Sequence, residues 1–309
     1  MIEVHELRKS YGDLVAVDNV SFTAEAGTVF GLLGPNGAGK STTIDCISGL
    51  VQPSGGRISV LGHDMATDAR RARKSLGVVP QTLALYEELS AEANLAYWGG
   101  AYGLAGSDLK KRVAEVLELT GLLDRAREPV KNFSGGMQRR LNFGCGFIHR
   151  PEVLLLDEPT VGVDPQSRIR MLDLIRELVA DGTCVLYTTH YMEEAESLCD
   201  RIGIIDHGKL LALGSLDQLR GAMGERDILR FAGQFAIDQV RAAIDEFGFA
   251  EVISSDKDTL MLSVDQASRN LSAILGALAA TGAEIHETVL TQPGLESLFI
   301  KLTGRELRE

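Results

Sequence analysis

Up to about residue 213, short apolar runs alternate with stretches of helical periodicity. Residues 28–33 and 153–156 are apolar runs of strand length, and this continuous apolar character is typical of central strands covered on both faces. Further strands are expected at residues 184–188 and 202–205. Apolar residues at helical spacing predict two amphipathic helices: Leu109, Val113, Val116 and Leu117 in the first, and Met171, Leu172, Ile175, Leu178 and Val179 in the second. The alternation predicts an α/β domain with a mostly parallel sheet and a helical insertion at about residues 82–150.

The pattern changes after residue 213. Segment 214–227 carries Gly214, Gly221 and Gly224 among mostly polar residues, which predicts a linker with one short helix. The segments that follow have the order βαββαβ, with strands at 228–231, 250–253, 260–264 and 284–290 and helices around 240–247 and 271–278. That order predicts a ferredoxin-like α+β domain, and a last helix contains Leu295, Leu298, Phe299 and Leu302. We therefore expect two domains, residues 1–220 and 221–309.

The charge of the chain narrows the choice of partners. Its 31 lysines and arginines against 43 aspartates and glutamates give a formal net charge of −12. The average field of such a protein repels phosphate backbones. Nucleic acid is therefore disfavoured as the main partner.

The sequence also bears on location. No apolar run reaches the roughly 18 residues that a membrane span needs, and the N-terminus lacks the pattern of a signal peptide. We expect a cytoplasmic protein that does not itself cross a membrane. The widely spaced Cys46, Cys145, Cys184 and Cys199 form no CxxC pair, so we expect reduced thiols packed as small hydrophobic groups, and no zinc or iron–sulfur site.

A glycine-rich segment between the first central strand and a helical run carries the clearest chemistry. It fits the pattern GxxxxGK[ST] and consists of Gly34, Pro35, Asn36, Gly37, Ala38, Gly39, Lys40 and Ser41, followed by Thr42. In this pattern the glycines let backbone N–H groups and the helix N-terminus face phosphate oxygens. Lys40 then reaches the β- and γ-phosphates, and Ser41 binds Mg²⁺. The segment predicts a P-loop that holds a nucleotide, ATP, with its Mg²⁺.

Two carboxylates follow the apolar run 153–156. Asp157 is placed to bind Mg²⁺ through water, and Glu158 is placed to take a proton from an attacking water molecule. Apolar strands that end in Asp-Glu are common, so this pair becomes specific only beside the P-loop.

A third segment identifies the family. Phe133-Ser134-Gly135-Gly136-Met137-Gln138 lies about 20 residues before Asp157, as the signature segment of ATP-binding-cassette (ABC) ATPases does. Over roughly residues 2–215 the chain resembles these ATPases, with the motifs in the family order. The resemblance implies that Tyr11 stacks on adenine and that Gln81 serves the Mg²⁺ and links the nucleotide to a membrane partner. It also implies that Asp164 lies at a dimer interface and that His190 contacts the γ-phosphate and orients the attacking water.

The signature segment implies a dimer. The resemblance implies that Ser134, Gly135 and Gly136 cover the γ-phosphate bound by another copy, so that ATP lies between two chains. Where the family usually has Gln after Gly136 this chain has Met137, which removes a polar side chain but leaves the backbone donors. Each of these residues also has an ordinary structural alternative: Tyr11 as a hairpin aromatic, Gln81 as a loop residue, His190 as a structural histidine. Ser134 would in any case cap the helix that follows it.

The C-terminal segment narrows the class of ABC protein. Residues 293–307 resemble the closing helix of ATPase subunits from type-two ABC exporters, the group that includes drug-resistance and polysaccharide or lipid export systems. That resemblance implies an ATPase that works as a homodimer, or as a heterodimer with a similar ATPase. Such a subunit lies on the inner face of the cell membrane, bound to a separate membrane-spanning permease. The alternatives are the ATPase of an importer and a non-transport regulatory ABC protein. A module that only binds nucleotide is disfavoured because Lys40, Asp157, Glu158 and His190 are all present.

The most aromatic stretch of the chain follows Gln81. Residues 82–102 contain the only tryptophan and three of the six tyrosines. Aromatic residues are enriched at protein interfaces because they bury a large area with few rotatable bonds. We expect part of this segment to form a groove for a short cytoplasmic helix of the permease. The alternative for any single residue is a place in the core of the helical insertion.

Overall fold

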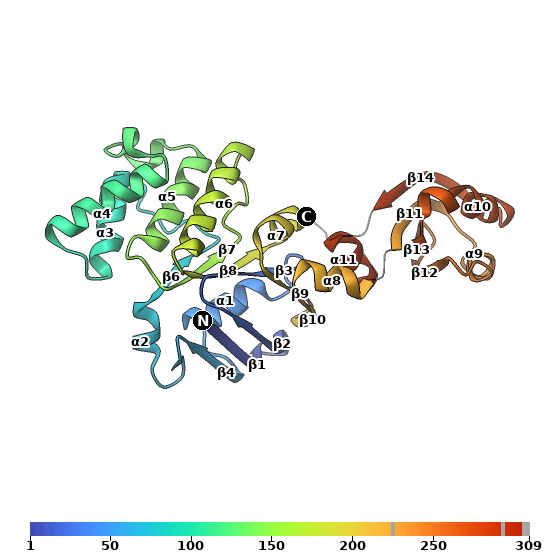
Figure 1. Cartoon of the computed structure of the whole chain (residues 1–309), viewed down its shortest axis with the longest axis horizontal. Helices are drawn as coiled ribbons and strands as arrows, with labels where there is room; N and C mark the ends of the chain where they lie inside the picture. The colour runs from blue at the N-terminus through green and yellow to red at the C-terminus, as the bar shows by residue number, and fades with distance from the viewer. Residues whose placement is uncertain (224–225, 292–293, 305–309) are drawn as a thin grey trace. The chain divides into compact units, whose positions relative to one another are not determined.

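The computed structural model describes residues 1–223, 226–291 and 294–304, and it divides into two compact units, Met1–Leu210 and Leu211–Glu309 (Figure 1). Gly224 of the expected linker, and residues 293 and 305–307 of the C-terminal segment, lie outside the described residues. The division falls earlier in the chain than the domain boundary expected at residue 220. Each unit has its own apolar core.

The first unit is built on a mainly parallel sheet. The strand order of the sheet is β10-β9-β3-β8-β7-β6, and the edge strand β10 crosses the division between the units. The pairs β3–β8, β3–β9, β6–β7 and β7–β8 are all parallel, as the alternation predicts. The strands are β3 (Val29–Leu33), β6 (Leu76–Val79), β7 (Val153–Asp157), β8 (Cys184–Thr189), β9 (Arg201–Asp206) and β10 (Lys209–Gly214).

Strand β7 shows why the apolar runs are continuous. Its odd and even residues both lie in apolar clusters, but in different ones. Leu154 and Leu156 pack with helices of the insertion, whereas Val153 and Leu155 pack with Ile44 and other residues on the opposite side. Because both faces of the strand are covered, no position can be polar until the strand ends at Asp157.

An antiparallel sheet at the N-terminus was not predicted. Its order is β2-β1-β4-β5, with β1 (Ile2–Tyr11), β2 (Leu14–Ala24), β4 (Gly55–Val60) and β5 (His63–Asp64). The register of β1 against β2 shifts at several points, and Glu6 has a left-handed φ of 47° there. Such bulges break the period of two by which a strand with one buried face is recognised in a sequence.

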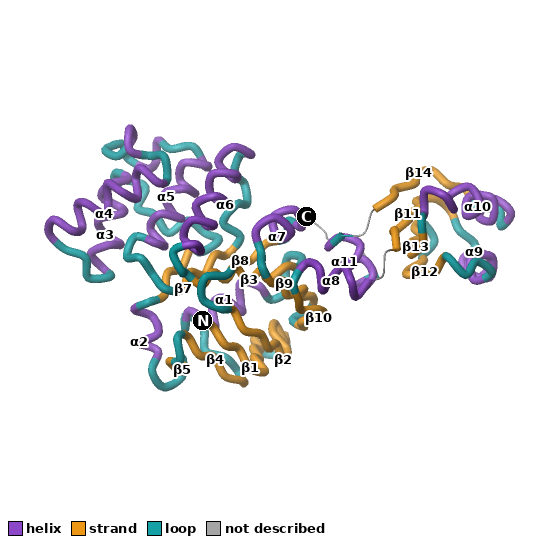
Figure 2. Tube along the Cα trace, in the orientation of Figure 1, coloured by secondary structure: helices purple, strands orange, loops and turns teal. Residues whose placement is uncertain are grey.

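Helices cover the parallel sheet and form the insertion. In Figure 2, α3, α4 and α5 lie together as one group of helices, and two short 3₁₀ turns, η1 and η2, connect α4 to α5. The stripe predicted for α4 is buried at Val113, Val116 and Leu117. The helices of this unit are α1 (Lys40–Ser48), α2 (Ala69–Lys74), α3 (Ala91–Ala101), α4 (Gly106–Leu119), η1 (Leu123–Arg125), η2 (Val130–Asn132), α5 (Gly135–Phe147), α6 (Pro165–Ala180) and α7 (Met192–Leu198).

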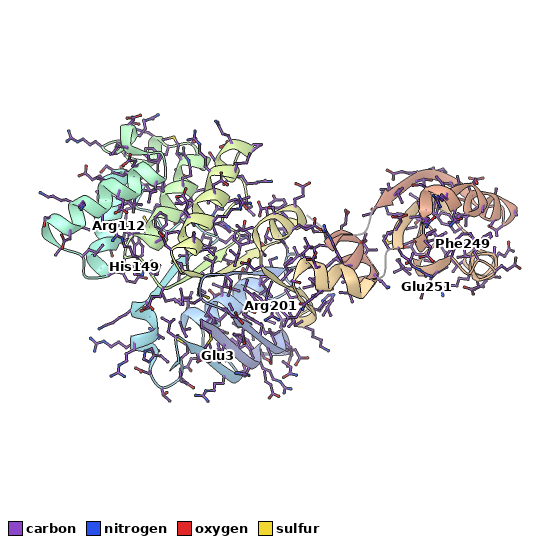
Figure 3. The ribbon with its side chains drawn as sticks, viewed as in Figure 1. Glu3, Arg112, His149, Arg201, Phe249 and Glu251 are labelled. Atoms are coloured by element: carbon purple, nitrogen blue, oxygen red, sulfur yellow. The ribbon has the colours of Figure 1, made fainter. Side chains whose placement is uncertain are left out.

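A buried arginine ties two helices of the insertion together. Arg112 of α4 donates from Nε to the carbonyl of Ile148 at 2.8 Å and from Nη2 to that of Phe147 at 2.9 Å (Figure 3). These carbonyls stand at the end of α5, where the regular helical hydrogen bonds stop, and that of Phe147 also accepts from the N–H of Arg150 at 3.0 Å. The contact fixes α4 against α5, the helix that begins at the signature segment.

The second unit has the predicted order of elements. Its antiparallel sheet has the order β12-β13-β11-β14, and Leu229, Phe231 and Leu262 pack under α9 and α10. The helix predicted to include Phe247 ends at Asp245, and Phe247 instead stacks on Phe249 with ring centroids 4.9 Å apart. The elements are α8 (Leu216–Met223), β11 (Arg226–Gln234), α9 (Ile237–Asp245), β12 (Ala250–Ser255), β13 (Thr259–Asp265), α10 (Ala267–Ala280), β14 (Glu284–Thr291) and α11 (Leu295–Thr303).

All four cysteines are free thiols, as expected. Cys46, Cys145 and Cys184 are buried, and Cys199 is partly buried. Burial raises the pKa of each thiol, that of Cys46 to about 11. Separately, no helix within the described ranges combines the length and apolar character that crossing a membrane requires.

Candidate nucleotide-binding site

The loop between β3 and α1 depends on glycine at two positions where backbones nearly touch. A Cβ atom on Gly34 would lie 2.1 Å from the carbonyl oxygen of Ile205. One on Gly39, where φ is 105°, would lie 2.5 Å from that of Ala16. A side chain at either position would displace backbone, so the loop reaches this compact shape only with glycine there.

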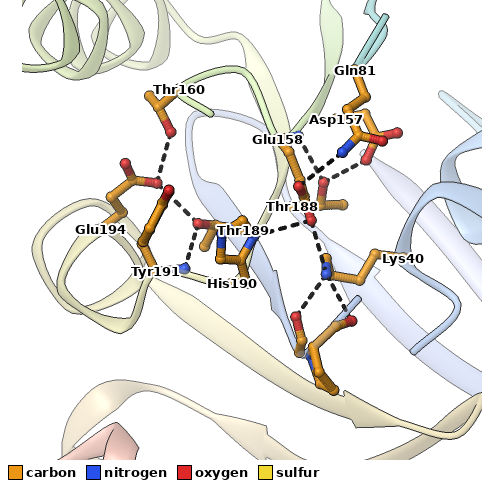
Figure 4. A network of polar contacts seen from close by, with 12 residues as sticks. Lys40, Gln81, Asp157, Glu158, Thr160, Thr188, Thr189, His190, Tyr191 and Glu194 are labelled. Atoms are coloured by element: carbon orange, nitrogen blue, oxygen red, sulfur yellow. Dashed lines mark hydrogen bonds and ion pairs between the residues drawn. The ribbon is translucent and has the colours of Figure 1, made fainter. Parts of the chain in front are cut away.

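Lys40 is the first residue of α1, and its side chain is only 4% exposed. Its Nζ lies 2.9 Å from Oε1 of Glu158 and donates to the carbonyls of Gly34 at 2.6 Å and Pro35 at 3.0 Å (Figure 4). The three donors of the ammonium group therefore each have an acceptor. Exchanging these acceptors for phosphate oxygens would leave the buried charge paired.

Asp157 lies at the end of β7, beside two hydroxyl groups. Its carboxylate accepts from Thr188 Oγ1 at 2.7 Å and is hydrogen-bonded to Ser41. Burial, together with the charge of Glu158, raises the pKa of Asp157, although the two hydroxyls and Lys40 oppose that shift. A carboxylate and a serine hydroxyl are the hard oxygen ligands that Mg²⁺ prefers. The donor set therefore fits a Mg²⁺ site at Ser41 and Asp157.

Glu158 is held by groups from several parts of the chain. Besides Lys40, its carboxylate accepts from Gln81 Nε2 at 3.1 Å and lies 3.4 Å from His190 Nδ1. Its own N–H donates to Thr188 Oγ1 at 3.0 Å. The backbone of Glu158 has a left-handed φ of 47°, an uncommon conformation for a residue with a side chain. It turns the chain sharply as β7 ends and directs the carboxylate to Lys40.

The charges around Glu158 decide its protonation. Burial alone would raise the pKa of this carboxyl group, but the hydrogen bond and charge of Lys40, with a smaller effect of His190, lower it overall. The group is therefore ionised at neutral pH. An ionised carboxylate in a buried site can accept a proton from water.

His190 follows β8 directly. Its ring is 9% exposed and packs against Tyr191, with ring centroids 4.2 Å apart. Within the described part of the chain, Nδ1 of His190 has no hydrogen-bond partner, although Glu158 Oε1 is 3.4 Å away. An unpaired buried ring nitrogen at the edge of the site is available to a ligand.

Half of the predicted site residues line one pocket of about 440 Å³, and Asp157 and His190 are not among its lining residues. Its walls come from the ends of β1 and β2, from the P-loop, and from the segments after β6 and β7. Leu14 and Ala16, which the sequence patterns did not single out, belong to it. The lining residues are Tyr11, Leu14, Ala16, Asn36, Gly37, Gly39, Lys40, Ser41, Thr42, Gln81 and Glu158.

The signature residues lie at a second place, outside that pocket. Ser134 caps α5 by accepting from the N–H of Met137 at 3.3 Å, as predicted, and both Ser134 and Gly135 are exposed. Asp164 caps α6 by accepting from the N–H of Ser167 at 2.9 Å. A Cβ on Gly136 would lie 2.9 Å from Oδ2 of Asp164, so the two capped helix starts are neighbours. One chain therefore carries two separate clusters of predicted site residues.

Sequence patterns missed the threonines that hold Asp157, Glu158 and His190 in place at the ends of β7 and β8. Thr188 bonds both Asp157 and the backbone of Glu158, and Thr189 accepts from the N–H of Tyr191 at 2.9 Å. A Thr-Thr pair at the end of an apolar strand is a visible signal. Its meaning depends on the neighbouring strand, which the sequence does not place.

Comparisons with known proteins agree with this geometry. The family model described as ABC transporter matches residues 17–161. The linearmycin resistance ATP-binding protein LnrL of Bacillus subtilis is 42% identical over 100% of both chains. The Nod factor export ATP-binding protein I of Sinorhizobium fredii is 38% identical over 100% of this chain and 87% of its own length.

Two solved structures are similar to part of the chain. The ATP-binding subunit of an ABC transporter is 34% identical with a TM-score of 0.68, and the match covers 72% of this chain and 93% of that one. A dimeric ATP-binding cassette in a post-hydrolysis state, bound to ADP and Pi, is 25% identical with a TM-score of 0.65, over 70% and 98% of the two chains. Given these matches and the P-loop pocket, the chain belongs to the ATP-binding proteins of the ABC transporter family.

Proposed function

We propose that the chain hydrolyses ATP to power export through a separate membrane-spanning permease. The observation that carries the hydrolytic part is the buried contact of Lys40, Glu158 and His190 at the P-loop. Export is supported by the full-length similarity to ATP-binding proteins named for resistance and for Nod factor export. The substrate would pass through the permease, so its identity does not follow from this chain.

We assign roles to the site residues as follows. Lys40 holds the β- and γ-phosphates, Glu158 accepts the proton of the attacking water, and His190 orients that water and the γ-phosphate. Tyr11, 47% exposed at the rim of the pocket, offers a ring face to adenine. When bound, Mg²⁺ neutralises charge that develops on the phosphate oxygens, and Ser41, Asp157 and Gln81 would hold it.

We propose that two copies, or this chain and a similar ATPase, form the working unit. Ser134 and Gly135 are exposed at a helix N-terminus, which is an arrangement that binds anions. They do not line the P-loop pocket of their own chain, so they would cover the γ-phosphate held by the other copy. Asp164 lies beside them at the start of α6 and would face the same interface.

We propose that the permease docks near a second pocket of about 370 Å³. Leu50, Pro80, Trp98 and Tyr102 are among the residues that line it, and Leu50 is 79% exposed. The aromatic segment 82–102 divides between core and surface. Leu95 is buried and Trp98 donates to the carbonyl of Ala84, whereas the exposed members are Leu83, Tyr86, Leu89, Tyr97 and Tyr102.

The docking proposal is tested with Tyr86→Asp. Tyr86 is 45% exposed, whereas Leu85 packs on the core, so Tyr86 is the better site for a charge. Tyr86 reaches the pocket through Tyr97, which packs on the lining residue Trp98. The control is Leu123→Asp, which places the same charge on a residue of the insertion that is 49% exposed and lies outside segment 82–102. We expect Tyr86→Asp alone to lose permease-stimulated hydrolysis while keeping basal hydrolysis and fold. Retained stimulation rejects the docking site.

The proposed function itself is tested by ATPase measurements on the chain with and without its permease in membranes. Stimulation by the permease, with hydrolysis lost in Glu158→Gln, supports an ATPase that drives transport. Binding of ATP without hydrolysis in both conditions would favour a module that only binds nucleotide. An adjacent gene for a periplasmic binding protein would favour import instead.

We further propose that residues 1–220 form the ATP-binding domain and residues 221–309 an accessory domain. In this arrangement the protein is peripheral on the inner face of the cell membrane and is held there by the permease. Cell fractionation with and without the permease gene tests this location.

A further inference from the structure

A second buried glutamate lies beside the nucleotide pocket and has no part in the roles assigned above. Glu194 of α7 is only 3% exposed. Its Oε2 accepts from Tyr187 OH at 2.7 Å, from Thr189 Oγ1 at 2.9 Å and from Thr160 Oγ1 at 3.0 Å. Figure 4 shows Thr160, Thr189 and Glu194 next to the contacts of Glu158. Burying a carboxylate is costly. The three hydroxyl donors on one oxygen of Glu194 therefore indicate that this residue has a defined task.

The hydroxyl groups come from the two segments that carry the hydrolytic residues. Thr160 lies in the same turn as Glu158, two residues further on, and Thr189 directly precedes His190. Thr189 also accepts from the N–H of Tyr191, so the chain is held on both sides of His190. The carbonyl of Thr189 accepts from the N–H of Gly34 at 3.3 Å, which adds a contact to the P-loop. One carboxylate therefore joins the segment after Glu158 to the segment before His190.

A cation completes the cluster. Arg168 Nε lies 3.4 Å from Glu194 Oε1, and its guanidinium lies over the ring of Tyr191, 4.7 Å from the centroid. Arg168 is in the first turn of α6, where its N–H donates to the carbonyl of the capping Asp164. The negative charge of Glu194 is thus compensated from the helix whose start lies beside the signature residues.

A carboxylate suits this place better than an amide would. Three hydroxyls can donate to it, because an ionised carboxylate only accepts. Burial and the charge of Glu194 raise the pKa of Tyr187 well above its usual value, so the phenol stays protonated and donates. A glutamine that keeps its oxygen towards these hydroxyls turns its NH₂ group to Arg168, which sets donor against donor. Turned the other way, its NH₂ group makes the hydroxyls accept, so they lose the acceptor that they share in Glu194.

We propose that Glu194 is a positioning residue of the hydrolytic site, which fixes His190 relative to Glu158 by holding Thr189 and Thr160 on one oxygen. The inference rests on the proposed function, because it assumes that Glu158 and His190 act on the water and the γ-phosphate. Glu194 touches neither of them. It acts through the loop, so its loss changes the rate of the chemical step and not the binding of ATP.

The first test is Glu194→Gln in the full chain. Because a misplacement of about 1 Å can cost on the order of 10²-fold in rate, we expect kcat to fall by about 10- to 100-fold. The KM for ATP and the circular dichroism spectrum should remain those of the wild type. A kcat within about twofold of the wild type overturns the proposal.

The second test is a double-mutant cycle with His190→Ala. If Glu194 acts through His190, adding Glu194→Gln to His190→Ala causes no further loss of kcat, because the residue to be positioned is already absent. Losses that multiply mean that the two residues act independently, and they overturn the proposal.

A third test does not depend on the folding of Glu194→Gln. Thr189→Val removes the hydroxyl with little change of shape, whereas Thr189→Ser keeps it. We expect the serine variant to retain kcat and the valine variant to lose it. Tyr187→Phe is the matched control, because it removes a donor to the same oxygen but leaves Thr160 and Thr189 joined. A loss in Tyr187→Phe equal to that in Thr189→Val means that Glu194 supports β8 and not the loop, and it rejects the proposal.

These results separate the inference from the proposed function. If His190→Ala keeps the wild-type kcat, the role assigned to His190 fails. If His190→Ala loses activity and Glu194→Gln does not, only the role of Glu194 fails.

Discussion

Glu158 and Glu194 are both 3% exposed, yet their surroundings differ in kind. Glu158 meets a lysine, a glutamine amide and a histidine. Glu194 meets two threonine hydroxyls, a tyrosine hydroxyl and an arginine. The partners of Glu158 can all exchange its carboxylate for a phosphate or a water molecule. Those of Glu194 belong to β8, to α6 and to the turn after β7, and they are not among the residues that line the nucleotide pocket.

The difference explains how one region can react while its neighbour stays fixed. A base must take up a proton, so its contacts have to change during the reaction. A group that sets the distance between two loops works only if its contacts persist. Buried charge alone therefore does not identify a catalytic carboxylate, and the chemistry of its partners is more informative.

The largest expected effect is the loss of ATP hydrolysis in Glu158→Gln, which should exceed the loss expected for Glu194→Gln. Glu158→Gln should lower ATP hydrolysis by about 10²- to 10⁴-fold, because the base is removed while the shape is kept. ATP affinity should stay intact, and the variant should elute as a dimer with ATP and as a monomer without it. Phosphate release and size-exclusion chromatography measure both. Wild-type turnover in this variant would end the distinction drawn between Glu158 and Glu194.

The next effect concerns the free energy of unfolding. It tests whether Glu158 needs the positive charge of Lys40 for the folded state to be stable when no nucleotide is bound. Lys40→Met leaves a buried carboxylate without its cation, which typically costs about 3–5 kcal/mol. Adding Glu158→Gln to Lys40→Met should restore most of this loss, because neither position of the pair then carries a charge. Urea denaturation of the two variants measures the difference. An equally unstable double variant would show that the pair does not carry the stability of this region.

A smaller effect follows from the lowered pKa of Glu158. A carboxyl group whose pKa is lower in the folded protein contributes stability above its unfolded pKa. That contribution is lost as the pH falls through its folded pKa. The stability of the wild type should therefore fall more steeply below about pH 4.5 than that of Glu158→Gln. Thermal denaturation at a series of acidic pH values makes the comparison, and parallel curves would contradict it.

The smallest effect has the opposite sign. The pKa of Asp157 is raised by burial and by the charge of Glu158, so its ionised form costs stability at neutral pH. Asp157→Asn should raise the free energy of unfolding, on the order of 1 kcal/mol, while Mg²⁺-dependent hydrolysis is lost. A lower melting temperature would mean that the bonds of Asp157 to Thr188 and Ser41 outweigh this repulsion.

The sequence predicts those parts of the molecule in which a local pattern has one physical cause. The apolar run 153–156 is continuous because β7 is covered on both faces, and Gly34 and Gly39 are required because backbones approach there. The N-terminal sheet escaped prediction because bulges interrupt the alternation in β1. In each case the decisive factor is whether the constraint leaves an unbroken pattern in the residues of the element itself.

Glu194 could not be predicted for the same reason. It stands next to Glu193 in a short helix, and the sequence presents the two as equal. One is exposed and the other is buried. What distinguishes them is the position of Thr160, 34 residues earlier, which only the folded chain brings within hydrogen-bond distance.

The burial of the cysteines gives the experimenter a practical advantage. Maleimide and other thiol reagents attack the thiolate, and burial has raised the pKa of every thiol in this chain. The natural protein should therefore react slowly with a fluorescent maleimide. A single Ile169→Cys substitution, at a 60% exposed position on the helix that Asp164 caps, would then accept the dye selectively. The native cysteines could remain in place while the label reports the approach of a second chain.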